Sequence, residues 1–194
     1  PYRDWYIENK SDLLKNDLFH KGIKFVDNVE FYESIKLKIL NASHSALAYL
    51  GLLLGHKYVH EAIGDELCYN FINNYVDREV IPTIQQQDNF DLIQYKKDVL
   101  KRFRNHFLNH KLEQIGMDGS LKLPIRIIDT FKNKDENTEY VYTYIIIACW
   151  ILFLKQNNIN KFNYAVSDPM FDDLFNIVNN EKNIVDKIIN LKNI

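Results

Sequence analysis

Four side chains that could act together in proton transfer lie within one short stretch of the sequence: Glu33, Lys36, Asn41 and His44. If this stretch is an α-helix, each residue turns by about 100°, so the four side chains fall within one sector about 140° wide. The opposite side of the same helix is apolar. A helix that carries a carboxylate, an amine, an amide and an imidazole on one side is suited to line a cleft.

These groups suit a reaction in which a proton moves while negative charge builds on an oxygen. A lysine in a poorly hydrated cleft loses proton affinity, so Lys36 could act as a general base near neutral pH. The amide of Asn41 could stabilise an alkoxide or polarise a carbonyl. His44 could orient a substrate hydroxyl, and Glu33 could pass the proton on to water. The spacing by itself also fits a solvated helix face without a chemical role.

One long helix is expected to position these residues. Apolar residues recur at helical spacing from Phe31 onward, which predicts a helix over 31–54 that ends near Gly55. Asp65, Asp91 and Ser120 are predicted to be the N-caps of later helices. These later helices are predicted over 65–81, 91–103, 107–116, 120–131, 139–156, 169–179 and 181–191, with loops at 85–89 and 133–137.

The N-terminal segment, 1–29, is predicted to be an irregular arm. Within it, 22–27 alternates apolar and polar residues and is expected to form a short strand or an extended arm. The sequence has no Gly-x-Gly-x-x-Gly and no strand–helix alternation. It therefore predicts an all-α, multi-helix domain with an irregular N-terminal arm and no Rossmann half of its own.

The composition excludes several classes of protein. The 194 residues are 46% hydrophobic and 26% charged, as in an average globular domain. A net charge of −2 argues against a dedicated nucleic-acid binder. The longest apolar run, 140–154, is shorter than the about 20 residues that span a bilayer, so we expect a buried core helix and no membrane association.

Two further features concern the cellular compartment. The first residues do not have the pattern of a signal peptide. Cys68 and Cys149 both lie in apolar surroundings, which predicts buried thiols rather than a disulfide. Together these features predict a cytoplasmic protein.

The pattern Lys36-x4-Asn41-x2-His44 resembles the signature of the polyol-specific long-chain dehydrogenases. Three other segments resemble the same family. The segment Trp-Tyr-Ile-Glu at 5–8 is similar to a Trp-x-Ile-Glu at the start of the family's C-terminal domain. Pro82-Thr83 is similar to a Pro-Thr that follows the family's second helix. The segment 117–126 is similar to its Met-Asp-Gly-Ser-x-Lys-Leu-Pro-x-Arg. The resemblance covers 1–155, with all four segments in the family's order.

This resemblance implies that 1–194 is the C-terminal catalytic domain of a mannitol dehydrogenase-like enzyme, with a fold like that domain of 6-phosphogluconate-dehydrogenase-like enzymes. Its partner would be an N-terminal Rossmann domain that binds NAD or NADP and is absent from this sequence. The family uses no metal. By resemblance, Lys36 is the general acid/base and Asn41 the oxyanion-hole amide. His44 contacts the reacting oxygen, and Glu33 gates proton exchange.

The reaction that the resemblance implies is the interconversion of a ketose or keto-uronate and its alcohol. The segment 117–126 looks like that of the mannitol 2-dehydrogenase and fructuronate reductase branch, so the pairs are mannitol and fructose, or mannonate and fructuronate. Lys122 and Arg126 lie four residues apart on one helix face and are candidates for substrate binding, because the arginine fork matches a carboxylate. A salt bridge or plain surface charge is their alternative role.

Other interpretations remain open at the level of the sequence. The chain could be a non-enzymatic helical module for protein interaction or dimerisation. The pairs His56/His60 and His106/His110 have a spacing that zinc ligands use, but no His-Glu-x-x-His occurs, so surface or packing histidines are expected. The basic stretch 96–104 is interpreted as a solvated helix face rather than a phosphate site.

Overall fold

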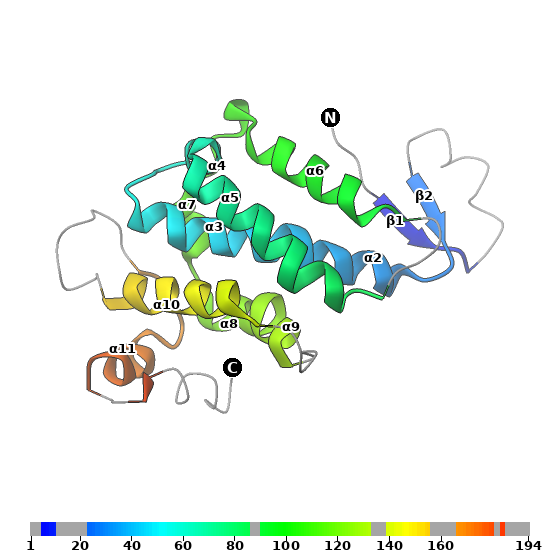
Figure 1. Ribbon diagram of the computed structural model, residues 1–194. Coiled ribbons are helices and arrows are strands. Elements are labelled where there is room, and N and C mark those ends of the chain that lie inside the picture. The colour runs from blue at the N-terminus through cyan, green and yellow to red at the C-terminus, as the bar shows by residue number, and fades with distance from the viewer. Residues whose placement is uncertain are drawn as a thin grey trace.

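The computed structural model describes residues 5–10, 23–85, 90–132, 139–155, 166–180 and 183–184, and this part of the chain is mostly helical, as predicted (Figure 1). Its first half contains β1 (Trp5–Glu8), β2 (Ile23–Val26), α2 (Val29–Ile35), η3 (Lys36–Asn41), α3 (Ala42–Leu53), α4 (Val59–Gly64), α5 (Glu66–Tyr75), η4 (Val76–Val80) and η5 (Ile81–Thr83). Its second half contains α6 (Leu92–Phe103), η6 (His106–Leu108), α7 (Leu112–Gly116), α8 (Gly119–Leu123), η7 (Pro124–Ile128), α9 (Asp129–Lys132), α10 (Val141–Lys155) and α11 (Phe171–Asn180).

The predicted long helix is present as three consecutive segments, α2, η3 and α3. Asn28 begins it, because its side chain accepts hydrogen bonds from the backbone N–H groups of Glu30 and Phe31, at 2.9 and 3.3 Å. It ends at Gly55, whose φ of 89° is left-handed. The α3 segment is the centre of the core, packed against α4, α5, α7 and α10 (Figure 1).

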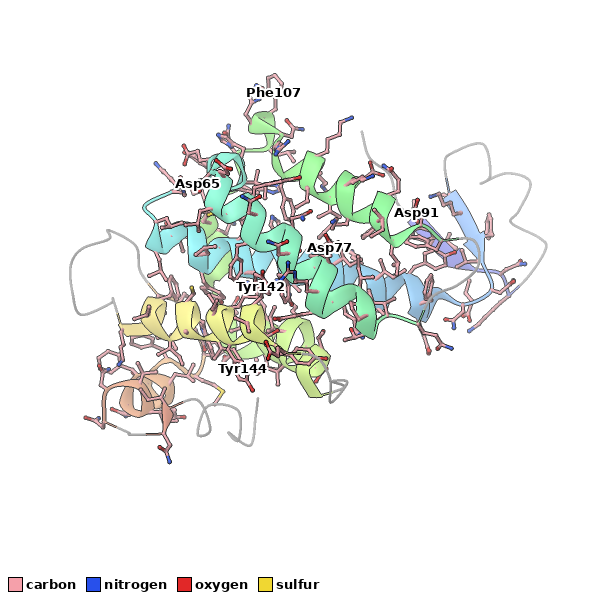
Figure 2. The ribbon with its side chains drawn as sticks, viewed as in Figure 1. Asp65, Asp77, Asp91, Phe107, Tyr142 and Tyr144 are labelled. Carbon is pink, nitrogen blue, oxygen red and sulfur yellow. The ribbon has the colours of Figure 1, made fainter. Side chains whose placement is uncertain are left out.

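Two aspartates cap the next helices, as the sequence predicts: Asp65 begins α5 and Asp91 begins α6 (Figure 2). The two helices are joined through Lys96. Its ammonium lies 2.6 Å from a carboxylate oxygen of Asp77 and 2.9 Å from the amide oxygen of Asn73. The expectation of a solvated basic face is therefore wrong for Lys96, which is buried because a carboxylate on the neighbouring helix offsets its charge.

The segment around Gly119 differs from the prediction. Ser120 is not an N-cap, because α8 begins one residue earlier and Asp118, in a left-handed conformation, occupies the cap position. The backbone N–H of Ser120 instead donates to Asp168, at 2.8 Å. A Cβ atom at Gly119 would lie 2.4 Å from the indole nitrogen of Trp150, so only glycine fits there.

The helix predicted over 107–116 is divided into η6 and α7. Asn109 adopts a left-handed conformation with φ of 45°, which ends the first segment. The short helix α4 was not predicted.

The apolar helix α10 is only partly buried, which corrects the expectation of a core helix. Val141, Tyr144, Ile145 and Leu152 are exposed along one side. Figure 2 shows Tyr142 directed towards α5 and Tyr144 directed away from it. Among the described residues, no helix combines the length and apolar character needed to cross a membrane.

The N-terminal arm is more regular than predicted. Strands β1 and β2 form a two-stranded parallel sheet in which Trp5 pairs with Ile23 and Glu8 with Val26. The strand expected within 22–27 is confirmed, and the irregular structure expected for 5–8 is wrong because these residues pair with β2. The predicted loop 133–137, most of the loop 85–89 and most of the helix 181–191 lie outside the described residues.

Candidate active site

A groove of about 450 Å³ runs beside the first part of the long helix, and Glu33 and Lys36 line it. The α2 and η3 segments form one wall and α6 contributes to the other, while β1 closes one end. Five aromatic side chains contribute to the lining: Trp5, Tyr6, Tyr32, Phe90 and Tyr95. Lys36 is exposed in this chain, so the groove by itself does not provide the poorly hydrated environment expected for it.

His44 lies in a second, much smaller hollow of about 20 Å³. Its imidazole stacks on Phe103, with ring centroids 4.6 Å apart and planes 10° apart. Its Nε2 atom is buried and has no hydrogen-bond partner among the described residues. Burial, followed by electrostatic interactions with His110, Arg126 and Arg102, lowers the pKa of His44 from 6.5 to about 4. The imidazole is therefore neutral at physiological pH.

The groove and the hollow adjoin each other, because Leu40 and Arg102 line both. Glu33 and Lys36 thus line one of two neighbouring hollows, and His44 lines the other. Asn41 is half-buried on the same helix and contributes to the lining of neither. The sequence predicts that Arg102 lies on a solvated helix face. The structure places it at both hollows because α6 packs against η3, a contact that the sequence alone does not indicate.

A π-helical turn carries the candidate residues. Lys36 is the first residue of η3 and Asn41 is the last. The directions calculated for a regular α-helix therefore do not apply between them, since a π-turn contains more residues than an α-turn. Two other π-segments, η4 and η7, pack against η3, and η7 contains Arg126. Such π-bulges within helices frequently occur at functional sites.

Arg126 reaches the long helix beside His44. Its Nη1 donates a hydrogen bond to the hydroxyl oxygen of Ser45, at 3.0 Å, while its buried Nε has no partner among the described residues. Burial lowers the pKa of its guanidinium below the ordinary value. Lys122, the other predicted substrate-binding residue, donates instead to the backbone carbonyl oxygens of Met117, at 2.6 Å, and Ile115, at 3.3 Å. The hydrogen bonds of the two side chains therefore go to different partners.

Lys38, two residues after Lys36, has a different environment. Its ammonium donates to the carbonyl oxygen of Thr83 at 3.2 Å, and burial lowers its pKa. This contact joins η3 to η5, so Lys38 has a structural role on the side of the helix away from Lys36.

The four histidines at zinc-like spacing all contact protein groups: His106 lies against Phe107 and His110 against His44. His56 lies 3.3 Å from a carboxylate oxygen of Asp65, and His60 stacks on Tyr58. His56, Asp65 and Cys68 offer ligand atoms within 4.8 Å of one another. Asp65 already caps α5, and without a metal ion burial raises the pKa of the Cys68 thiol to about 12. Both cysteines are buried and free, as predicted.

The low pKa of His44 predicts a dependence of stability on pH. Between about pH 6.5 and pH 4 the unfolded chain binds a proton at His44 that the folded chain does not bind. We therefore expect the free energy of unfolding to fall by up to about 3 kcal/mol as the pH is lowered through this range. Urea unfolding at pH 7 and pH 4 measures the change.

A His44→Phe variant is the control for this prediction, since phenylalanine keeps the stacking on Phe103 and cannot titrate. Its unfolding free energy should fall less over the same pH range than that of the unmodified chain. An equal fall in both proteins would show that other groups cause the acid sensitivity.

Known proteins share the sequence pattern and the fold of this chain. The sequence pattern of the family "Mannitol dehydrogenase C-terminal domain" matches residues 28–194. The chain is 31% identical over 169 residues to D-arabinitol 4-dehydrogenase of Klebsiella pneumoniae, covering 87% of this chain and 37% of that protein. It is 32% identical over 171 residues to D-mannonate oxidoreductase of Escherichia coli, covering 88% of this chain and 35% of that protein.

The fold also matches a solved structure, the ternary complex of Pseudomonas fluorescens mannitol 2-dehydrogenase with NAD and D-mannitol. The TM-score is 0.89 at 30% identity, and the match covers 100% of this chain and 40% of that one. The chain therefore spans between about a third and two fifths of the length of these relatives.

Proposed function

Because the chain belongs to the mannitol dehydrogenase C-terminal domain family, we propose that it is the catalytic domain of an NAD(P)-dependent oxidoreductase that interconverts a ketose or keto-uronate and its alcohol. The observation that carries this proposal is the position of Lys36. It lines a groove large enough for a sugar ring or chain, on the same helix as Asn41 and His44. A non-enzymatic helical module would have no use for this arrangement.

In the direction of reduction, Lys36 donates a proton to the substrate's keto oxygen as the carbon–oxygen double bond becomes a single bond. In the direction of oxidation the amine takes the same proton back from the hydroxyl. Glu33 lines the groove three residues earlier and exchanges this proton with water. Asn41 lines neither hollow, and the family resemblance assigns it the donation of an amide N–H to the oxygen while this oxygen carries negative charge. Neutral His44 orients the reacting hydroxyl.

NAD or NADP, when bound, supplies or accepts the hydride at the carbon. The residues that this chain contributes fit a planar ring, since the groove beside Lys36 is lined by five aromatic side chains. No Gly-x-Gly-x-x-Gly occurs in the sequence. We therefore propose that a separate nucleotide-binding domain, as partner, binds the pyrophosphate and the adenosine of the cofactor.

We propose that this partner domain contacts the β1–β2 end of the groove. A two-stranded parallel sheet is marginally stable by itself, and Trp5 on β1 is 63% exposed while it also lines the groove. A domain that covered this end would remove water from Lys36. It would thereby create the poorly hydrated environment that proton transfer by a lysine needs.

Arg126, which contacts Ser45 next to His44 on the long helix, is proposed to bind the substrate. Its unpartnered Nε is a buried donor, and such donors are rarely left unpaired. If the substrate is a keto-uronate, we expect Arg126→Gln to lower kcat/KM for the keto-uronate by about tenfold or more relative to a neutral ketose, because an arginine–carboxylate contact is lost. Steady-state assays with fructose and fructuronate measure this ratio.

The function is tested in the polypeptide that joins this chain to a nucleotide-binding domain. Oxidation of NADH or NADPH is followed at 340 nm with a panel of ketoses and keto-uronates. Turnover of at least one of them is the expected result. Absence of turnover with every member of the panel, in a protein that binds the cofactor, would reject the oxidoreductase and favour the helical interaction module.

A further inference from the structure

Three side chains of the kinds that bind metal ions meet where the long helix ends and α5 begins. They are His56, Asp65 and Cys68, and their ligand atoms all lie within 4.8 Å of one another. Figure 2 shows Asp65 at the junction of α4 and α5. None of the three side chains lines the groove or the small hollow, so the cluster lies outside the candidate active site.

The two carboxylate oxygens of Asp65 have different surroundings. Its Oδ1 accepts hydrogen bonds from the backbone N–H groups of Leu67 and Cys68, at 2.8 and 3.3 Å, and thereby caps α5. The hydrogen bond from the Cys68 N–H is the first of several causes that lower the pKa of Asp65, so Asp65 is a carboxylate at neutral pH. Its Oδ2 faces His56 and lies 3.3 Å from the Nε2 atom.

The separation of His56 and Asp65 fits a zinc ion better than it fits a strong ion pair. Charge-assisted hydrogen bonds from nitrogen to a carboxylate are about 2.7–2.9 Å long, and the observed 3.3 Å is longer. In a tetrahedral zinc site the Zn–N and Zn–O distances of about 2.0–2.1 Å place the two ligand atoms about 3.3 Å apart. The Cys68 sulfur, within 4.8 Å of both atoms, needs to approach them to about 3.5 Å, since Zn–S bonds are about 2.3 Å long.

We propose that His56 Nε2, Asp65 Oδ2 and Cys68 Sγ bind one Zn²⁺ ion, with a water molecule as the fourth ligand. The side chains of His56 and Asp65 are 24% and 34% exposed, so the ion enters from the solvent and the water lies on that outer side. A nitrogen, an oxygen and a sulfur ligand together favour zinc, because Mg²⁺ and Ca²⁺ prefer oxygen ligands alone.

The ion takes the place of the proton on the Cys68 thiol. This thiol is fully buried and free, and burial raises its pKa to about 12 when no metal is bound. As the Zn–S bond forms, the S–H bond breaks and the proton goes to water. The hydrogen bond from the Cys68 N–H to Asp65 Oδ1 then holds a ligating carboxylate in place, as partners behind metal ligands commonly do.

The ion would tie the end of the long helix to the start of α5. His56 follows the long helix directly, and its backbone N–H donates to the carbonyl oxygen of Gly51 at 2.9 Å. Asp65 and Cys68 belong to the cap and the first turn of α5. Since the three ligands meet only in the folded chain, saturating Zn²⁺ should raise the midpoint of urea unfolding. The role is structural, and it does not depend on the proposed oxidoreductase activity.

Co²⁺ is the probe for this site, because it replaces zinc and its bond to a thiolate gives a charge-transfer band in the near ultraviolet. The polypeptide that joins this chain to a nucleotide-binding domain is freed of metal and titrated with Co²⁺, and Zn²⁺ is then added. We expect one equivalent of Co²⁺ to produce the band and Zn²⁺ to remove it. Cys68→Ser should abolish the band. Cys149→Ser is the matched control and should keep it, because Cys149 is also buried and free but is not a member of the cluster.

Asp65→Asn separates metal binding from helix capping. Asparagine caps a helix about as well as aspartate, so α5 is kept while the carboxylate ligand is lost. The affinity for Co²⁺ should fall by more than the about 10–100-fold that the loss of a partner behind a ligand costs. His56→Gln should weaken binding to a similar degree. His60→Gln should not, because His60 stacks on Tyr58 and is not a member of the cluster.

Several outcomes would overturn the proposal. One is a charge-transfer band that survives Cys68→Ser, and another is an unchanged affinity for Co²⁺ in both Asp65→Asn and His56→Gln. The folded polypeptide could also give no band with one equivalent of Co²⁺, or no shift of its urea midpoint with Zn²⁺, and either result would reject the site. None of these measurements requires turnover of a sugar, so the failure of the proposed function and the failure of the zinc site are distinguishable.

Discussion

Lys36→Ala is expected to reduce kcat by about 10²–10⁴-fold, the usual contribution of one positioned general acid/base. KM should change little, because the proposed role of Lys36 is to transfer a proton in the transition state and not to bind the ground state. The measurement is steady-state NAD(P)H oxidation in the polypeptide that also carries the nucleotide-binding domain. A small amine added to the assay should restore part of the rate.

Two neighbouring substitutions make this test specific. Lys36→Arg keeps the positive charge but cannot lose its proton, so it should remain as inactive as Lys36→Ala. Lys38→Met removes the contact with Thr83, and it should lower stability while most of kcat survives. If Lys36→Arg retained most of the rate, Lys36 would act by charge alone and the proton-transfer assignment would be wrong.

The parts of the fold that the sequence predicted well depend on interactions between residues close in the chain. Asp65 and Asp91 cap helices through backbone N–H groups two or three residues away. The long helix from Val29 to Leu53 follows from its repeated apolar positions and from the absence of proline. Such signals are readable from a single sequence because donor and acceptor lie in one short window.

The parts that the sequence missed depend on partners far apart in the chain. Ser120 was expected to cap its own helix, but its N–H donates to Asp168, 48 residues later. Arg102 enters the site only because α6 packs along η3. The exposed side of α10 was missed for another reason, since a helix that is apolar all round has no periodicity to show which side faces the core.

The candidate site was predictable in its residue types and not in its environment. The sequence indicates the amine, amide and imidazole, but it assumes regular α-helical directions across a segment that is a π-helix. It also expects Lys36 to be poorly hydrated, whereas this side chain is exposed and burial lowers the pKa of Lys38 instead. Burial depends on which elements pack together, and for Lys36 we propose that it comes from the nucleotide-binding partner domain.

The Glu79 carboxylate is expected to be the polar group whose removal costs most stability. It is fully buried in η4 and accepts hydrogen bonds at the start of α10, at 2.6 Å from Tyr142 N, 2.8 Å from Thr143 N and 2.7 Å from the Thr143 hydroxyl. These donors belong to the first turn of a helix, where N–H groups lack partners within the helix and the helix dipole favours negative charge.

Glu79→Ala leaves these donors buried without an acceptor, so we expect the free energy of unfolding to fall by about 3 kcal/mol or more. Glu79→Gln keeps the size of the side chain and one acceptor oxygen, so its free energy of unfolding should lie between those of the unmodified chain and Glu79→Ala.

Glu61→Ala is the matched control. Glu61 also accepts two backbone hydrogen bonds at a helix start, at 2.9 Å each, but it is exposed. Water can therefore replace it, at a cost of about 1 kcal/mol. Urea unfolding measures all three variants. An equal loss of unfolding free energy in Glu79→Ala and Glu61→Ala would mean that water reaches the start of α10. The contact between η4 and α10 would then not depend on a buried carboxylate at Glu79.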